Sequence, residues 1–274
     1  MNTVNNVSKT LYIPLCGKAY VSSKGVILHD PRAETIWNRV KFPLAPGAQS
    51  RWLAYYLSMR AAVYDAWVTE QLAADPDACV VHIGCGLDSR CERTALACPW
   101  YDVDFPDVIA ERKLYYEETD RYHMIGADVT QPGWTDCLPG GHAVIVMEGV
   151  SMYLSPDALR DVLAELAAHF DRCDLLVDYY TAKGAKLSAV KNPIHAVGAD
   201  KVYGYDKPEE LARGGFALTK VHSITPDRLI RELNGLEAAV FRTLYGGRLA
   251  AGLYAMAEYT ANGPYVPKHG KKEN

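Results

Sequence analysis

The sequence predicts an α/β fold built on a Rossmann-like, mostly parallel sheet, and three observations support this prediction. Short β-branched, apolar runs alternate with segments of helical periodicity between residues 79 and 180, as βαβ units require. The chain has 274 residues, of which 49% are hydrophobic and 23% charged, so it has enough apolar sequence for a sizeable core. Glycines or polar residues follow the predicted strands, at the edge where parallel sheets bind ligands.

Two helices are expected before the first strand. Residues 1–29 are interpreted as loop with short extended pieces. The first helix is predicted at 30–40, because aspartate suits its N-cap and proline its first helical position. After a proline-containing break at 41–47, a long helix is predicted at 49–74, where an Asp-Pro-Asp turn ends it.

Strands and helices then alternate. The first five strands are expected to be short, buried runs at 79–84, 100–105, 122–126, 143–147 and 174–179. The intervening helices are expected at 88–98, 106–118 and 155–170. Two later strands are expected at 216–222 and 252–259. The remaining segments give weaker patterns: 181–206 is interpreted as irregular, and 227–251 is ambiguous because glycines interrupt a helical pattern.

Composition favours one soluble enzyme-sized domain over residues 1–274, with a helical lid or extension at 1–75 and a Rossmann-like core at 79–260. Seven cysteines without a C-x-x-C pair predict a reducing compartment and no metal site. A net charge of -4 gives no reason to expect nucleic acid or an anionic membrane as a partner. No apolar run approaches the roughly 18 residues of a membrane span, so a cytoplasmic protein is expected.

The residues at the ends of the first two strands are the strongest indication of a ligand-binding site in this sequence. The first strand ends in Gly84-Cys85-Gly86, where glycines let the backbone approach a ligand and the following helix offers unpaired N–H groups. The second strand ends at Asp104, and an acid at this position is able to accept both ribose hydroxyls of a nucleotide-like cofactor. The alternatives are a tight turn for the glycines and a helix cap for the acid.

The next two strands add further polar groups. Asp128 and Val129 combine an acceptor with an apolar wall, which suits the edge and the face of an adenine. The fourth strand ends at Glu148. An ordinary turn and a solvated loop acid are the alternatives for these residues. The order of such residues along the sheet favours a binding site over a series of unrelated turns.

Arg60 is an independent clue because it lies on the long helix among apolar residues at three- and four-residue spacing. A guanidinium in such a stripe either extends to solvent or meets an anion. This helix leads into the first strand, so one hypothesis is that Arg60 reaches the carboxylate of a cofactor as a fork.

The glycine turn resembles that of a nicotinamide dinucleotide site only in part. That fingerprint ends in glycine or alanine, whereas this sequence has Ser89. Asp88 stands where the helix start would meet a pyrophosphate, and an acid opposes phosphate. A cofactor without phosphate is therefore favoured, namely S-adenosylmethionine.

Three blocks of the sequence, VVHIGCGLDSRCER, WYDVDFPDVIAERKL and MEGVSMYL, closely resemble blocks of the leucine carboxyl methyltransferase superfamily. The bacterial branch of tetracenomycin-type polyketide O-methyltransferases is the nearer match, and the resemblance covers roughly residues 12–180. It implies a class I methyltransferase fold, with a seven-stranded sheet, an antiparallel last strand and helices that form a lid.

The resemblance also implies roles for single residues. Gly84 would lie under the methionine part of the cofactor, and Arg60 would bind its carboxylate. Asp104 would bind the ribose. At the remaining matched positions the resemblance implies adenine contacts for Asp128 and Val129, a further cofactor-site acid in Glu148, and a basic residue near the cofactor in Lys18.

The expected activity is methyl transfer to a carboxylate or a hydroxyl of a small molecule, and both acceptors stay open. A carboxylate needs no base because it is ionised near neutral pH, whereas a hydroxyl benefits from one. The candidates for such a base are Tyr153, Tyr180, His195 and His142. An NAD-type oxidoreductase and a non-catalytic cofactor-binding scaffold are the alternative functions.

Overall fold

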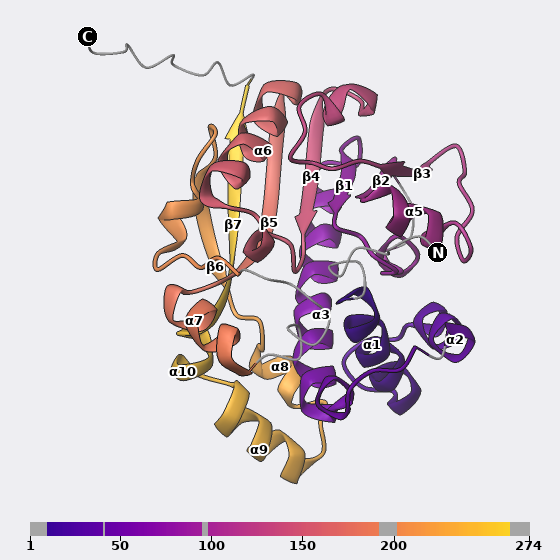
Figure 1. Cartoon of the computed structure of the whole chain (residues 1–274), viewed down its shortest axis with the longest axis vertical. Coiled ribbons are helices and arrows are strands. Elements are labelled where there is room, and N and C mark those ends of the chain that lie inside the picture. The colour runs from indigo at the N-terminus through magenta and orange to yellow at the C-terminus, as the bar shows by residue number, and fades with distance from the viewer. Residues whose placement is uncertain (1–9, 41, 95–97, 192–201, 264–274) are drawn as a thin grey trace.

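The computed structural model describes residues 10–40, 42–94, 98–191 and 202–263. Its centre is a seven-stranded sheet with the order β3-β2-β1-β4-β5-β7-β6 (Figure 1). β7 runs antiparallel to both of its neighbours, and the pairings among β1 to β5 are parallel. The strands are β1 (Cys79–Ile83), β2 (Trp100–Asp104), β3 (Tyr122–Gly126), β4 (His142–Met147), β5 (Arg172–Tyr180), β6 (Ala217–His222) and β7 (Tyr254–Asn262). The predicted fold class is confirmed, including the antiparallel last strand.

The central strands are apolar on both faces because helices cover both sides of the sheet. Successive side chains point to opposite faces, so Val80 and Val144 join one core cluster while Val81 and Ile145 join the other. All five residues of β1 are buried. Continuous apolar runs in the sequence were therefore a correct sign of buried parallel strands.

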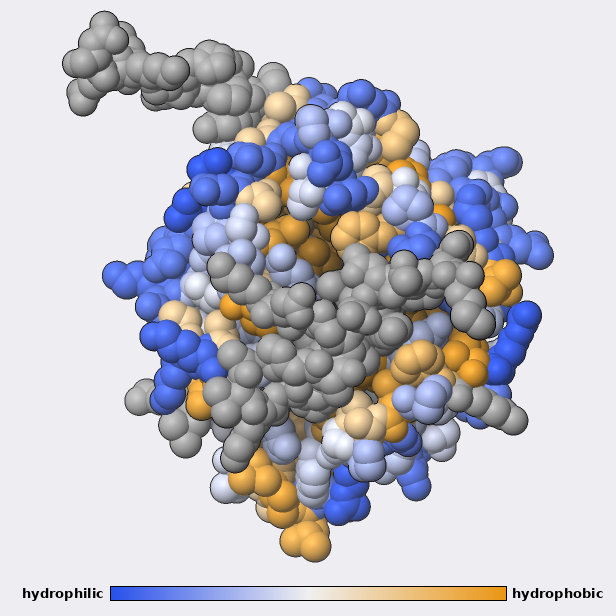
Figure 2. Space-filling view, viewed as in Figure 1, coloured by the Kyte–Doolittle hydropathy of each residue, from blue (hydrophilic) through white to orange (hydrophobic). Residues whose placement is uncertain are grey.

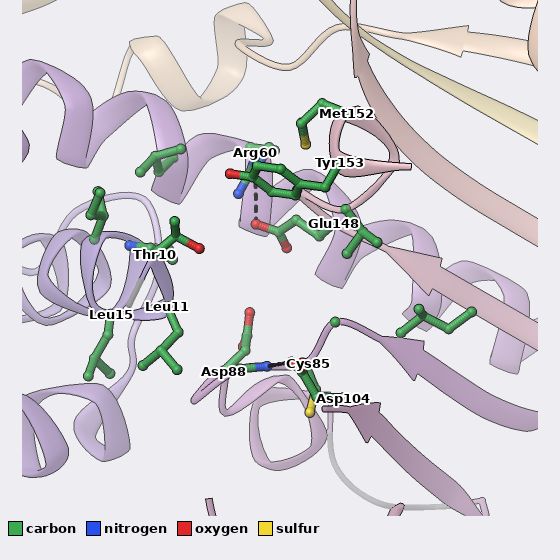
Figure 3. A pocket seen from close by; sticks show the side chains of 18 of the residues that line it. Thr10, Leu11, Leu15, Arg60, Cys85, Asp88, Asp104, Glu148, Met152 and Tyr153 are labelled. Carbon is green, nitrogen blue, oxygen red and sulfur yellow. Dashed lines mark hydrogen bonds and ion pairs between the residues drawn. The ribbon is translucent and has the colours of Figure 1, made fainter. Parts of the chain in front are cut away.

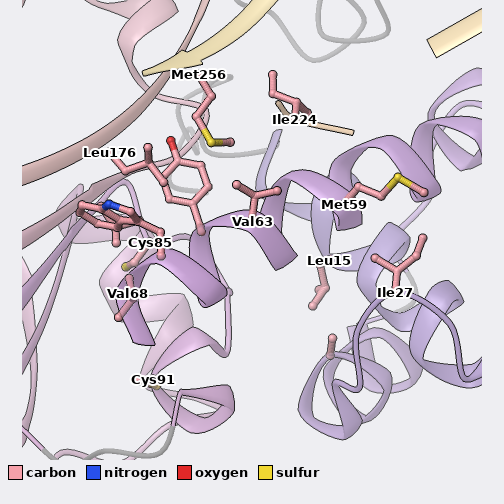
Figure 4. Close-up of a cluster of buried hydrophobic side chains, with 14 of the residues drawn as sticks. Leu15, Ile27, Met59, Val63, Val68, Cys85, Cys91, Leu176, Ile224 and Met256 are labelled. Atoms are coloured by element: carbon pink, nitrogen blue, oxygen red, sulfur yellow. The ribbon is translucent and has the colours of Figure 1, made fainter. Parts of the chain in front are cut away.

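Three helices precede the sheet, and the third of them packs on the first of these faces. They are α1 (Tyr12–Lys24), α2 (Pro31–Val40) and α3 (Arg51–Ala74). Figure 4 shows side chains of α3, including Val63 and Val68, beside Leu176 of β5 and Met256 of β7, which all belong to one cluster. The opposite face is covered by α6 (Pro156–His169), whose buried leucines join the second cluster.

The carboxyl ends of the strands face a group of helices from both ends of the chain. In Figure 1 the arrowheads of β4 and β5 point toward the lower part of the molecule, where α1 and the later helices lie. The later helices are α7 (Ala182–Lys191), α8 (Asp227–Ile230), α9 (Gly235–Tyr245) and α10 (Arg248–Ala251). The remaining short elements are α4 (Arg90–Arg93), α5 (Pro106–Arg112), η2 (Pro46–Gln49), η3 (Trp134–Cys137), η4 (Ser151–Tyr153) and η6 (Pro208–Leu211).

The N-terminal segment differs from its prediction. Residues 1–29 were expected to be loop, but α1 occupies much of this stretch. Pro14 lies in its first turn, where backbone N–H groups have no helical partner, so the proline does not break the helix. The helix ends at Gly25, which has a φ of 66°, a left-handed conformation that glycine adopts without strain.

Three other predicted segments also differ from the structure. The stretch 181–206 was expected to be irregular, yet it begins with α7, and its residues 192–201 lie outside the described residues. Of the helix expected at 88–98, α4 covers Arg90–Arg93, and residues 95–97 lie outside the described residues. The helix expected at 106–118 ends at Arg112, as α5. Arg112, the last residue of α5, donates to the backbone carbonyls of Gly86 and Asp88 at 2.9 and 2.7 Å. No helix in the described ranges is long and apolar enough to span a membrane.

Candidate functional site

The carboxyl edge of the sheet borders a cavity of about 860 Å³. All eight residues predicted to bind the cofactor line it: Lys18, Arg60, Gly84, Gly86, Asp104, Asp128, Val129 and Glu148. Figure 2 shows hydrophobic residues in a hollow near the ends of β4 and β5, within a largely hydrophilic surrounding surface. In the close view of Figure 3, strand-end residues such as Asp104 and Glu148 face Leu11 and Leu15 of the N-terminal segment. The fold thus brings together residues that are far apart in the sequence.

The turn after β1 requires its glycines. Gly84 and Gly86 have φ values of 70° and 51°, a region that side-chain-bearing residues rarely adopt. A Cβ on Gly84 would lie 2.2 Å from Cγ2 of Val150. The N–H of Gly86 donates to Oδ2 of Asp104 at 2.8 Å, so this turn and the end of β2 form one unit.

Asp104 belongs to this unit rather than to a helix cap. Its Oδ1 accepts the N–H of Phe105 at 2.8 Å, and Phe105 itself is the N-cap of α5. Burial raises the pKa of Asp104 to about 6, although the hydrogen bonds from Gly86 and Phe105 act in the opposite direction. Each carboxylate oxygen has one protein donor and keeps a further lone pair, which leaves two acceptor sites side by side.

Arg60 is buried and paired, and it does not extend to solvent. Its Nε donates to Oε1 of Glu148 at 3.0 Å, and its Nη1 donates to Oδ2 of Asp178 at 3.1 Å. Nη1 also donates to the hydroxyl of Tyr254 at 2.8 Å. Within the described residues, Nη2 makes no hydrogen bond and lies beside Gly149. Arg60 therefore keeps one donor for a ligand in the cavity.

Glu148 lies between two arginines, so the interpretation as a solvated loop acid is wrong. It is 9% exposed, and Nη2 of Arg90 donates to its Oε2. Burial alone would raise the pKa of Glu148, but the charges of Arg90 and Arg60 lower it below its ordinary value. Arg90 is itself fully buried and also donates from Nε to Asp65 at 2.7 Å. These contacts hold Glu148 ionised and in a fixed orientation.

Lys18 comes from α1 and reaches the start of α4. Its ammonium pairs with Oδ2 of Asp88. The other oxygen of Asp88 accepts the N–H of Arg90 at 2.8 Å and lies 3.0 Å from Nη1 of Arg93. Burial alone would raise the pKa of Asp88, and the cations Arg93, Lys18 and Arg90 lower it well below the usual range. A carboxylate thus occupies the helix start where a dinucleotide would need its pyrophosphate.

The pair Asp128 and Val129 lies beyond the end of β3. Oδ1 of Asp128 accepts the N–H and the hydroxyl of Thr130 at 3.0 and 2.7 Å, so the residue does form the local turn that was the alternative interpretation. Its Oδ2 makes no hydrogen bond with the described residues. Val129 packs against the second core cluster and lines the cavity. An acceptor and an apolar surface are therefore available together.

The residues considered as a base have different positions. Tyr153 and Tyr180 line the cavity, and burial raises the pKa of Tyr153 to about 12. His142 lies at the opposite edge of the sheet, at the start of β4, where its ring nitrogens contact Asp75 and Asp174. It does not line the cavity, so that candidate is wrong. His195 lies outside the described residues.

Two further residues complete this network: Asp178, which the sequence shows only as a polar residue at the end of the fifth strand, and Arg90, which sequence reasoning missed. Asp178 is fully buried and accepts hydrogen bonds from Tyr64 at 2.7 Å and Gly149 at 2.8 Å, besides those from Arg60 and Tyr254. Burial raises the pKa of Asp178 and Arg60 counteracts this. An acid within an otherwise apolar strand was the available signal for Asp178. Arg90 lies on a one-turn helix, and no periodic pattern marks it as buried.

Comparison with known proteins gives consistent findings. Residues 17–167 match the leucine carboxyl methyltransferase family. The chain is 34% identical over 191 residues to the tetracenomycin polyketide synthesis O-methyltransferase TcmP of Streptomyces glaucescens, over 68% of this chain and 70% of that protein. It is 24% identical over 234 residues to the S-adenosyl-L-methionine-dependent methyltransferase dpfgK of Gibberella zeae, over 76% and 78% of the two chains.

A solved structure from Thermobifida fusca, of a protein assigned as a methyltransferase, is similar with a TM-score of 0.56. The two sequences are 15% identical, and the match covers 90% of this chain and 94% of that one. At this identity the likeness supports the class I methyltransferase fold.

Proposed function

The chain belongs to the leucine carboxyl methyltransferase family and is an S-adenosylmethionine-dependent methyltransferase, and we propose that it methylates an oxygen of a small natural-product-type molecule. The acceptor oxygen is that of a carboxylate or a hydroxyl. The observation that carries the proposal is the convergence of Arg60, Asp104 and Asp128 on one cavity, each with hydrogen-bonding capacity left after its contacts with the described residues. Nothing in the comparisons supports an NAD-type oxidoreductase.

The proposed cofactor contacts follow from the remaining donors and acceptors. Arg60 Nη2 binds the carboxylate of the methionine part, and Asp104 accepts from the two ribose hydroxyls. Asp128 Oδ2 accepts from the adenine amino group while Val129 packs on the adenine face. Gly84 and Gly86 let the backbone approach the ligand closely. Glu148 and Lys18 act through the network around the cavity rather than as isolated charges.

The charges of the cavity wall fit this cofactor better than a dinucleotide. Four carboxylates line the cavity, from Asp88, Asp104, Asp128 and Glu148. A wall rich in carboxylates favours a cationic sulfonium and opposes a pyrophosphate. The lysine and the arginine of the wall are already paired with carboxylates. Residues 1–75, which include α1 and α3, are proposed as the helical lid over this site.

The chemistry divides between the cofactor and the chain. Bound S-adenosylmethionine supplies a methyl group that is already activated by its sulfonium. The chain's own residues bind that cofactor, orient the acceptor oxygen and exclude water. A carboxylate acceptor needs no base. For a hydroxyl acceptor, Tyr153 is suited to donate a hydrogen bond, since its raised pKa of about 12 keeps it protonated, and Tyr180 and His195 stay candidates for the base.

A transfer assay tests the proposed acceptor chemistry. The purified protein is incubated with S-adenosylmethionine carrying a labelled methyl group and with a panel of small carboxylic acids, phenols and amines. Label that appears on carboxyl or hydroxyl groups supports the proposal, and alkali then separates esters from ethers. Label only on nitrogen or carbon would contradict it. Cofactor binding without transfer to any acceptor would favour the non-catalytic scaffold.

A further inference from the structure

His82 is a buried histidine in the middle of the sheet. It lies on β1, two residues before Gly84, and it is 2% exposed. Its side chain also contributes to the wall of the cavity. An imidazole ring carries two polar nitrogens, and the burial of polar groups without partners costs free energy. The role of His82 therefore depends on what its two ring nitrogens contact.

The contacts of the ring define its protonation state. Nη1 of Arg90 lies 3.2 Å from Nε2 of His82, and a guanidinium only donates, so Nε2 accepts and carries no proton. The proton of the neutral ring is then on Nδ1, which lies 3.2 Å from Oδ1 of Asp102 without the alignment of a hydrogen bond. Burial lowers the pKa of His82 and the charge of Arg90 acts in the same direction, whereas Asp102 raises it. The charge of Asp88 also raises this pKa. His82 is therefore a neutral acceptor for Arg90.

On one side, His82 completes the contacts of Arg90. The three nitrogens of this guanidinium have different partners: Nε donates to Asp65, Nη1 to His82 and Nη2 to Glu148. Asp65 and Glu148 hold one edge of the planar group, and His82 is the acceptor at the remaining nitrogen. The ring of Tyr64, whose centroid is 5.1 Å from the guanidinium carbon, supports the plane by contact and not by a directed hydrogen bond. Because a guanidinium is rigid, three acceptors at three nitrogens fix both its position and its tilt.

On the other side, His82 lies beside the contacts that hold the glycine turn. Asp102 is its neighbour on β2 in the register of the sheet. Asp102 pairs with Arg112 at 2.5 Å, and Arg112 donates to the backbone carbonyl of Gly86 at 2.9 Å. His82 thus stands between the arginine that holds the glycine turn and the arginine that orients Glu148.

We propose that His82 is a positioning residue for cofactor binding. As a neutral acceptor it fixes the plane of Arg90, and Arg90 in turn orients Glu148 at the wall of the cavity. The inference rests on the proposed function, because it assumes that this cavity binds S-adenosylmethionine. It concerns the geometry of binding and adds no chemical step to the methyl transfer.

A pair of substitutions separates the acceptor from the space that the ring fills. His82→Leu keeps a side chain of similar size and removes the acceptor, whereas His82→Gln removes the ring and places an amide oxygen within reach of Arg90. Since the loss of a hydrogen bond from a charged group changes an equilibrium by roughly tenfold or more, His82→Leu is expected to bind S-adenosylhomocysteine about tenfold more weakly than the wild type in calorimetry. His82→Gln is expected to recover the affinity to within about threefold of the wild type. The matched control is His123→Leu, because His123 is a partly buried strand histidine that stacks on Tyr101 at 4.9 Å and does not line the cavity; it should bind as the wild type does.

Nitrogen NMR of the wild-type protein tests the protonation state of the ring without any substitution. The chain has 8 histidines, and the signal that is missing from the spectrum of His82→Gln identifies His82. Near neutral pH, where an ordinary histidine is close to its titration range, His82 is expected to show a proton-bearing Nδ1 and a bare Nε2. A proton on Nε2, with or without one on Nδ1, overturns the inference, because such a ring cannot accept from Arg90.

The titrations also distinguish a failure of this inference from a failure of the proposed function. Absence of S-adenosylhomocysteine binding by the wild type counts against the proposed function. If the wild type binds normally, three results count against the positioning role of His82 alone: unchanged binding by His82→Leu, an equal loss in His82→Leu and His82→Gln, or the same loss in His123→Leu.

Discussion

Asp104→Asn is expected to weaken cofactor binding and to remove its dependence on pH. The carboxylate has one backbone donor on each oxygen, from Gly86 and Phe105 at 2.8 Å. An asparagine turns one of these oxygens into an NH₂ group that faces an N–H, and it also removes the charge that strengthens bonds from the ribose hydroxyls. Hydrogen bonds to charged groups are worth about 1.5 to 3 kcal/mol, so affinity should fall roughly ten- to a hundredfold.

The pH dependence follows from the pKa of about 6 that burial gives Asp104. Above this pH the carboxylate is ionised and accepts from the ribose, and below it a proton occupies one acceptor site. Affinity is therefore full above about pH 7 and falls as the pH decreases through 6, by about tenfold at one unit below the pKa. The affinity falls as the pH decreases because the ionised form of Asp104 is the form that binds the ligand.

Calorimetric titration with S-adenosylhomocysteine between about pH 5 and 7.5 measures both effects. The wild-type protein should lose affinity toward the acid end, and Asp104→Asn should be weak and nearly flat. Asp161→Asn, an exposed acid on α6, serves as the matched control and should follow the wild type. An Asp104→Asn variant with wild-type affinity, or with the same pH profile, would refute the assignment of Asp104 to the ribose.

Three further substitutions test the glycine turn and the buried charges. In a urea titration, Gly84→Ala should lose about 1 to 3 kcal/mol of unfolding free energy. The reason is that its φ of 70° disfavours a side chain and that a Cβ would lie 2.2 Å from a methyl of Val150. The control Gly140→Ala has open space around it and should leave the unfolding free energy unchanged. Arg60→Met removes the cation from buried Asp178 and one of the two arginines from Glu148, and it should cost about 3 to 5 kcal/mol of unfolding free energy. It should also abolish S-adenosylhomocysteine binding in whatever fraction folds, and wild-type stability would contradict the pairing. Arg90→Lys replaces a guanidinium, which donates to Asp65 and Glu148 from different nitrogens, by a single ammonium group. Calorimetry should then show several-fold weaker binding of S-adenosylhomocysteine. An unchanged affinity would mean that Arg90 does not orient Glu148.

The strand-end residues were predictable because two simple patterns coincide at them. Buried parallel strands appear as short apolar runs, and the sheet topology then brings their carboxyl ends together. Asp104 and Glu148 each follow such a run, so both could be assigned to one site without knowledge of their contacts. Gly84 was predictable for the same reason, since a strand that ends in glycine before a helix indicates a close backbone turn.

The partners of these residues could not be predicted because they depend on tertiary packing. Arg90 is fully buried on a four-residue helix, and a helix this short has no apolar stripe from which burial could be inferred. Asp178 was visible as a strand-end acid, but its role depends on Arg60 arriving from α3. α1 was missed because residues 1–29 were interpreted as loop, and Pro14 lies in the first turn of this helix, where proline is tolerated.

The most direct test of the account is a pair of calorimetric titrations of the purified protein, one with S-adenosylhomocysteine and one with NAD. The account predicts binding of S-adenosylhomocysteine in the micromolar range, about 8 kcal/mol of binding free energy, and no heat from NAD, because carboxylates line the turn where a pyrophosphate would lie. Binding of NAD without binding of S-adenosylhomocysteine would contradict it.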